Sequence, residues 1–104
     1  MNTLAHIAVI GSLRFPPDRV ADLLPHMRAL LEASQKEEGC IGYWAGVDVC
    51  DPGVLRISEL WIDAEALQRH VKAPHIAPWH AAQKLCGMLE SRYQVIDIAH
   101  LRTV

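Results

Sequence analysis

The sequence predicts a single α+β domain in which helices lie over one face of a four-stranded sheet. Three observations lead to this prediction. Four segments are rich in β-branched and apolar residues, two stretches carry apolar residues at three- and four-residue intervals, and proline, glycine and aspartate mark the junctions. The chain has 104 residues, which suits one domain over residues 1–104 and is too short for two.

The first strand is expected over residues 4–15, a mainly apolar run that a pair of prolines brings to an end. A helix is expected over residues 18–38, with Gly39 as its C-terminal stop. The apolar stripe of this helix consists of Val20, Leu23, Leu24, Met27, Leu30 and Leu31. Pro25 removes one backbone hydrogen bond, and we expect a kink there.

Two further strands are expected over residues 41–49 and 54–62. An Asp-Pro-Gly turn at residues 51–53 joins them, which predicts a hairpin. Asp63 is a suitable N-cap for a short helix that runs to Val71.

Pro74 separates this helix from a second helical stretch over residues 75–89, and residues 92–100 form the last strand. The resulting order, β-α-β-β-α-β, is that of the ferredoxin-like sandwich.

Apolar residues occur on both faces of the predicted strands. In the first strand, Ile7, Val9 and Leu13 lie on one side, and Leu4, Ala8 and Ile10 lie on the other. The helices cover one face, so a second copy of the chain is expected to cover the open face. The expected assembly is a homodimer in which the two sheets face each other.

Charge and composition argue against several classes of partner. The formal net charge is −2 and no basic cluster is present, so we expect no nucleic-acid partner. No apolar run is long enough to span a bilayer, and residues 1–6 lack the pattern of a signal peptide. The three cysteines share no metal-ligand spacing, and we expect reduced thiols in a cytoplasmic protein.

Histidines are densest between residues 70 and 80, where His70, His75 and His80 lie beside Trp79. Histidine titrates closest to neutral pH, so this segment is the candidate for giving or taking a proton. Successive histidines are five residues apart, which does not place them on adjacent turns of one helix, and no metal site is expected. A capping or core role is the alternative for each histidine.

Trp61 and Trp79 are expected in the core, with contact to a ligand as the alternative. Glu59 precedes Trp61 by two residues and should point to the same side of its strand. A salt bridge at the sheet edge is the expected role of Glu59, and a buried acid is the alternative.

The segment from Glu59 to Leu67, followed by His70 and then Pro74-His75, resembles the antibiotic biosynthesis monooxygenase superfamily. That family typically shows an E-x-W at the end of the third strand, an acidic or serine cap, a short helix ending near a histidine, and a Pro-His step into the next helix. The resemblance implies a dimeric α+β barrel. It also implies a monooxygenase that uses no cofactor and oxidises small aromatic, quinol- or anthrone-like molecules with molecular oxygen.

The resemblance also implies two sets of site residues. The proton-transfer set is His70 and His75, and the substrate-binding set is Trp61, Trp79, His80 and Tyr93. If His75 is the base, His75→Ala should lower oxidation of a quinol or anthrone by roughly 10²–10³-fold.

Two other functions stay open, because one barrel can host many activities. The first is a non-enzymatic, small-molecule-binding or stress-related dimer, expected if Trp and Leu side chains fill the pocket. The second is a haem-binding or haem-degrading relative, with His80 near the place of the axial ligand. The first strand lacks the asparagine of that branch, and His70 stands where its tryptophan would be. A solvent-open pocket lined by two histidines would favour the monooxygenase.

Overall fold

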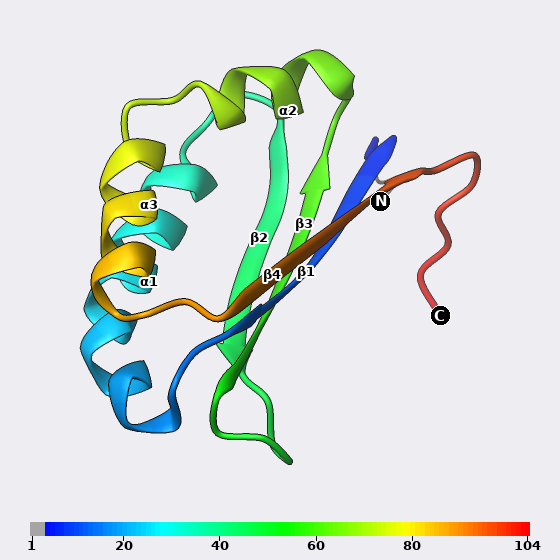
Figure 1. Cartoon of the computed structure of the whole chain (residues 1–104). Coiled ribbons are helices and arrows are strands. Elements are labelled where there is room, and N and C mark those ends of the chain that lie inside the picture. Colours follow the sequence, from blue (N-terminus) through cyan, green and yellow to red (C-terminus); the bar gives the residue numbers. More distant parts are fainter. Residues whose placement is uncertain (1–3) are drawn as a thin grey trace.

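The computed structural model describes residues 4–104 and shows a four-stranded antiparallel sheet with its helices on one face (Figure 1). The strands are β1 (Ile7–Arg14), β2 (Cys40–Val47), β3 (Val54–Trp61) and β4 (Glu90–Asp97). The helices are the 3₁₀ turn η1 (Pro17–Arg19), α1 (Val20–Gln35), α2 (Ala64–Val71) and α3 (Ile76–Leu85). The predicted ferredoxin-like order is confirmed, and the sheet order is β2-β3-β1-β4.

Residues 1–3, where the sequence was searched for a signal peptide, lie outside the described part of the chain. Within residues 4–104, no helix combines the length and the apolarity that crossing a bilayer would require.

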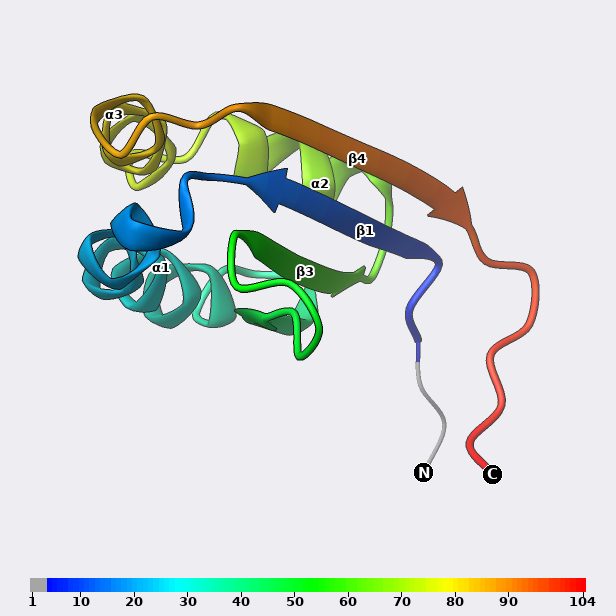
Figure 2. The same ribbon diagram turned by 60° about the horizontal axis from the view of Figure 1, so that its bottom comes forward.

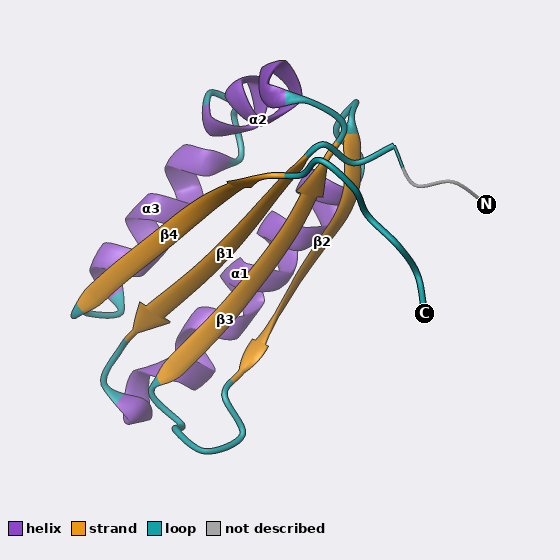
Figure 3. Ribbon diagram, turned by 90° about the vertical axis from the view of Figure 1, so that its right-hand side faces the viewer, coloured by secondary structure: helices purple, strands orange, loops and turns teal. Residues whose placement is uncertain are grey.

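Strand β1 lies inside the sheet between β3 and β4. Its successive side chains point to opposite faces, so every second side chain faces the helices. Ile7, Val9 and Leu13, which were predicted to share one side, are buried on the helical side, whereas Ile10 on the opposite side is 51% exposed. Figure 3 views this open face, with the helices behind the sheet.

Helix α1 supplies the other half of the core. Val20, Leu23, Met27 and Leu30 are buried at three- and four-residue intervals, so most of the predicted stripe faces the sheet. Leu24 was also predicted in the stripe, but it is 38% exposed and lies outside it. Each fully buried leucine contributes about 1.5–3 kcal/mol relative to exposure, which accounts for this helix better than its intrinsic propensity does.

The predicted C-terminal end of α1 is wrong. The helix stops at Gln35, not at residue 38, and Gly39 is not its terminal stop. The chain continues in tight turns, in which the Glu37 N–H donates to Ser34 and the Cys40 N–H donates to Glu37. Gly39 then takes a φ of +84° immediately before β2, a conformation that favours glycine. These turns free Glu37 from the helix, and its side chain reaches the site described below.

The last strand differs from the others in its surroundings. It spans residues 90–97 instead of the predicted 92–100, and all of its residues are exposed. Among the described strands, β4 pairs with β1 alone, at the outer edge of the sheet (Figure 2). Helix α3 packs beside α1, which leaves space between the helices and the helical side of β4.

Candidate active site

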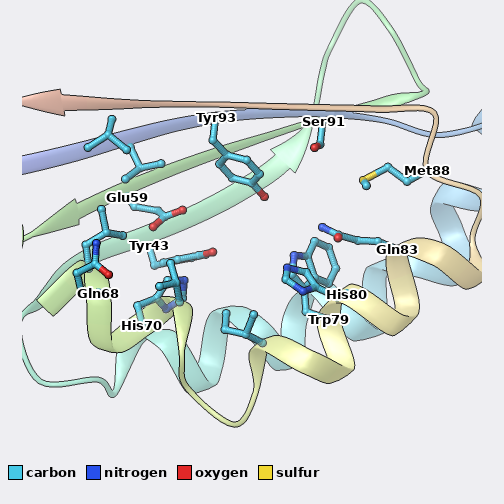
Figure 4. Close-up of a pocket in the computed structure, with 15 residues that line it drawn as sticks. Tyr43, Glu59, Gln68, His70, Trp79, His80, Gln83, Met88, Ser91 and Tyr93 are labelled. Atoms are coloured by element: carbon cyan, nitrogen blue, oxygen red, sulfur yellow. The ribbon is translucent and has the colours of Figure 1, made fainter.

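A pocket of about 520 Å³ occupies the space between β4 and helices α2 and α3 (Figure 4). Pockets of about 300–1,000 Å³ commonly hold small organic ligands. Its apolar lining consists of Val9, Leu67, Val71, Ile76, Trp79, Met88 and Val95. Its polar or titratable lining consists of Tyr43, Glu59, Gln68, His70, His80, Gln83, Ser91 and Tyr93. An apolar pocket with a few polar groups suits a small organic molecule, because the polar groups fix the orientation of the ligand.

Glu59 provides a buried carboxyl group at the inner end of the pocket. The residue is 4% exposed, and its Oε1 accepts the indole N–H of Trp61 at 2.9 Å. The prediction that Glu59 and Trp61 share one side of β3 is correct, but the salt bridge at a sheet edge is wrong. β3 lies between β2 and β1, so Glu59 is interior. Burial raises its pKa, which makes the carboxylate a better proton acceptor than one in water.

Two tyrosines bring hydroxyl groups to the same pocket. Tyr43 pairs with Glu59 across β2 and β3. Burial raises the pKa of Tyr43 far above its ordinary value. Tyr93 is 44% exposed as a whole residue, but its hydroxyl points into the pocket (Figure 4), where desolvation raises its pKa to about 12. Both therefore stay neutral hydrogen-bond donors near neutral pH. Tyr93 points from β4 into the pocket (Figure 4). Its ring lies over Gly11 of β1, where an added Cβ would come within 2.6 Å of Tyr93 Cε1.

His70 is held in the last turn of α2, and the N-cap Asp63 fixes where this helix begins. The Asp63 carboxylate accepts the Ala66 N–H at 2.8 Å. Ala66 and His70, four residues apart, are the buried residues of α2. The His70 ring packs against Trp61 and Tyr43, with centroid distances of 4.8 Å and 5.3 Å.

Glu37 connects His70 with His75. Its Oε2 accepts hydrogen bonds from His70 Nδ1 and from His75 Nε2, both at 3.0 Å or less. The three side chains offer donor atoms within 4.8 Å of one another, a set that divalent metals can use. In this structure direct hydrogen bonds join the three side chains.

The structure places the predicted site residues in two groups. His70, Trp79, His80 and Tyr93 line the pocket. Trp61 and His75 do not line the pocket. Trp61 is fully buried against the His70 ring. His75 is hydrogen-bonded to Glu37, away from the pocket.

Sequence reasoning did not identify Glu37 or Tyr43 as site residues, and it gave Glu59 a different role. For Glu59, the parity with Trp61 was a usable signal. Glu37 follows the apolar periodicity of α1 and lies 33 residues before His70, so no local pattern marks it.

Comparison with known proteins supports the same fold. Residues 6–82 match the model of the family described as antibiotic biosynthesis monooxygenase. A candidate antibiotic biosynthesis monooxygenase from Deinococcus radiodurans has a TM-score of 0.88 at 20% identity, covering 94% of this chain and 97% of that chain. Rv0793 from Mycobacterium tuberculosis has a TM-score of 0.83 at 23% identity, covering 93% and 98%. Another structure, described as an antibiotic biosynthesis monooxygenase, has a TM-score of 0.82 at 26% identity, covering 90% and 99%.

Among curated proteins, the uncharacterised protein sll1783 of Synechocystis is 28% identical over 69 residues, which are 66% of this chain. The chain spans about half of that relative's length, 47%.

Proposed function

This chain belongs to the antibiotic biosynthesis monooxygenase family, and on that premise we propose that it oxidises a small phenolic, quinol- or anthrone-like molecule with molecular oxygen. No metal or prosthetic group takes part in the proposed reaction. The observation that carries the proposal is the pocket itself, which joins an apolar enclosure to His70 and Glu59 at one end.

The proposed oxidation begins with proton removal, so the protein must supply a base, and the substrate anion itself supplies the electrons to oxygen. Removing a proton from an activated C–H or O–H group leaves an anion that is electron-rich enough to reduce oxygen. For an anthrone-like methylene, the carbon loses two hydrogens and gains one oxygen atom as a carbonyl. The second oxygen atom leaves as water with those two hydrogens. The protein supplies the base, hydrogen-bond donors to the anion, and an enclosure that excludes water.

The lining supports a separate role for each group. His70 accepts the substrate proton, because it is the histidine at the inner, buried end of the pocket. The Glu59 carboxylate stabilises the resulting imidazolium through its charge. The Tyr93 hydroxyl donates to the substrate anion, while Trp79 and His80 contact the ring system.

The proposed enzyme is a homodimer that pairs through the open face of the sheet. Strand pairing puts Ile10, Trp44 and Ile96 on that face, and they are between 41% and 53% exposed. Exposed apolar side chains grouped on one sheet face are typical of a buried interface.

The test is oxygen uptake by the full chain with a panel of quinols and anthrones. His70→Ala should lower the rate by roughly 10²–10³-fold. His26→Ala, which removes an exposed histidine of α1, is the matched control and should leave the rate unchanged. A wild-type protein that consumes no oxygen with any of these substrates would overturn the proposal. So would an unchanged rate in a folded His70→Ala variant. A Soret band on haem titration would redirect the assignment to the haem-binding branch.

A further inference from the structure

We propose that Glu37 is a positioning residue, which fixes the tautomer and ring orientation of His70 so that His70 Nε2 faces the pocket as the proton acceptor. The catalytic consequence of this inference rests on the proposed function, but the orientation itself does not. Glu37 lies in the turn between α1 and β2, outside the lining of the pocket.

The tautomer follows from the hydrogen bond. A neutral imidazole carries its hydrogen on one nitrogen, and the other nitrogen has the free lone pair. Glu37 Oε2 contacts His70 Nδ1, so an ionised carboxylate selects the form with hydrogen on Nδ1. The lone pair then lies on Nε2, across the ring from Glu37. Because His70 lines the pocket and Glu37 does not, Nε2 is the atom presented to a ligand.

Packing restricts the ring to this orientation. The His70 side chain is 6% exposed and packs against the rings of Trp61 and Tyr43, which also contact each other. Aromatic neighbours limit swinging of the imidazole, but they do not distinguish its two nitrogens. The carboxylate makes that distinction, as an acceptor behind a histidine commonly does in catalytic and metal sites.

His75 acts in this arrangement as a second anchor for Glu37 and not as a second base. Its Nε2 donates to the same carboxylate oxygen at 3.0 Å. Within residues 4–104, Glu37 contacts these two histidines and forms no ion pair with a lysine or arginine. The Glu37 side chain is 15% exposed and that of His75 is 20% exposed, so the support lies on the solvent side of His70. Removing His75 should therefore loosen Glu37 without removing the proton acceptor.

Nitrogen-15 NMR of histidine-labelled protein tests the orientation directly, because the two tautomers give different ring-nitrogen shifts. Neutral His70 in the wild-type protein should carry its hydrogen on Nδ1. In Glu37→Gln the ratio of the Nδ1–H form to the Nε2–H form should fall by roughly 10–100-fold. Glu38→Gln is the matched control, since Glu38 is exposed and adjacent, and it should leave the ratio unchanged. A wild-type His70 with hydrogen on Nε2, or an unchanged ratio in Glu37→Gln, would overturn the inference.

Kinetics then test the consequence. Glu37→Gln should lower kcat about 10²-fold with KM changed by less than about threefold. His75→Ala should lower kcat by about tenfold or less, clearly less than His70→Ala. Equal losses of kcat in His75→Ala and His70→Ala would contradict the anchor role. If the tautomer ratio responds to Glu37→Gln but the wild-type protein consumes no oxygen, the positioning role stands and the proposed function fails.

Discussion

The hydrogen bond between Trp61 and Glu59 should account for much of the stability of the inner end of the pocket. Trp61→Phe removes the indole donor and leaves the 4%-exposed Glu59 carboxylate without that partner. A hydrogen bond to a charged group contributes about 1.5–3 kcal/mol. The smaller ring also leaves a void, which costs about 1 kcal/mol if it is the size of a methyl group. We therefore expect Trp61→Phe to lower the free energy of unfolding by about 2.5–4 kcal/mol.

That loss is large enough for a thermal melt to resolve. An unfolding entropy of about 2.1 cal/mol/K per residue gives about 0.22 kcal/mol/K for a chain of 104 residues. The expected fall in Tm is then about 11–18 °C. Leu85→Ala, at a 71%-exposed position of α3 away from the open face, is the control and should shift Tm by less than about 4 °C.

A double-mutant cycle separates the hydrogen bond from the void. Trp61→Phe is measured by urea unfolding in the wild-type and Glu59→Gln backgrounds, at one protein concentration because the proposed dimer would unfold in a concentration-dependent way. The neutral amide that Glu59→Gln introduces accepts a weaker bond than the carboxylate, so the coupling energy should be about 1–2 kcal/mol. A coupling below about 0.5 kcal/mol would refute the reasoning, because the loss would then come from packing alone.

Three other perturbations follow from the same structure. Burial raises the pKa of Glu59 above its ordinary 4.5, so the folded state binds that proton more tightly than the unfolded state. Stability should therefore fall as pH rises from about 4.5 through the folded pKa, and Glu59→Gln should flatten that fall in urea unfolding across a pH series. Gly11→Ala should push Tyr93 into the pocket and weaken binding of an aromatic substrate about tenfold by titration; an unchanged affinity would show that Tyr93 moves elsewhere. Ile10→Arg on the open face should convert a dimer into a monomer in sedimentation velocity at micromolar concentration, whereas identical sedimentation would count against the proposed interface.

Periodicity was enough to predict the fold, because each element carries its own local pattern. The stripe of α1 and the alternation of β1 are properties of neighbouring residues, and the structure confirms both, apart from Leu24 of the stripe, which is exposed. The C-terminal end of α1 was harder to predict from the sequence. Lys36, Glu37 and Glu38 suit a helix by propensity, but they have no apolar side chain to bury, and the turn to β2 takes precedence.

The site was only partly predictable for the same reason. Histidine density indicated a region that lines the pocket, since α2 and α3 follow each other along the chain and carry His70 and His80. The roles of Glu59 and Glu37 depend on contacts between distant segments. Glu59 is interior because β3 is flanked by β2 and β1. Glu37 reaches His70 because α1 ends at Gln35, two residues before Glu37. Neither fact follows from residue spacing.

Strand β4 pairs with only one described strand, β1, and this affects how a ligand would enter the pocket. This strand bonds to β1 along one edge and carries Tyr93 and Val95 of the lining, yet no helix packs tightly upon it. Segments with few buried contacts open locally at low free energy. We therefore expect β4, the outer wall of the pocket, to open locally more often than the other strands. A bound aromatic molecule would pack against β4 and make such opening less frequent. Amide exchange in β4 should slow when the pocket is filled, while that of the interior strand β3 should hardly change.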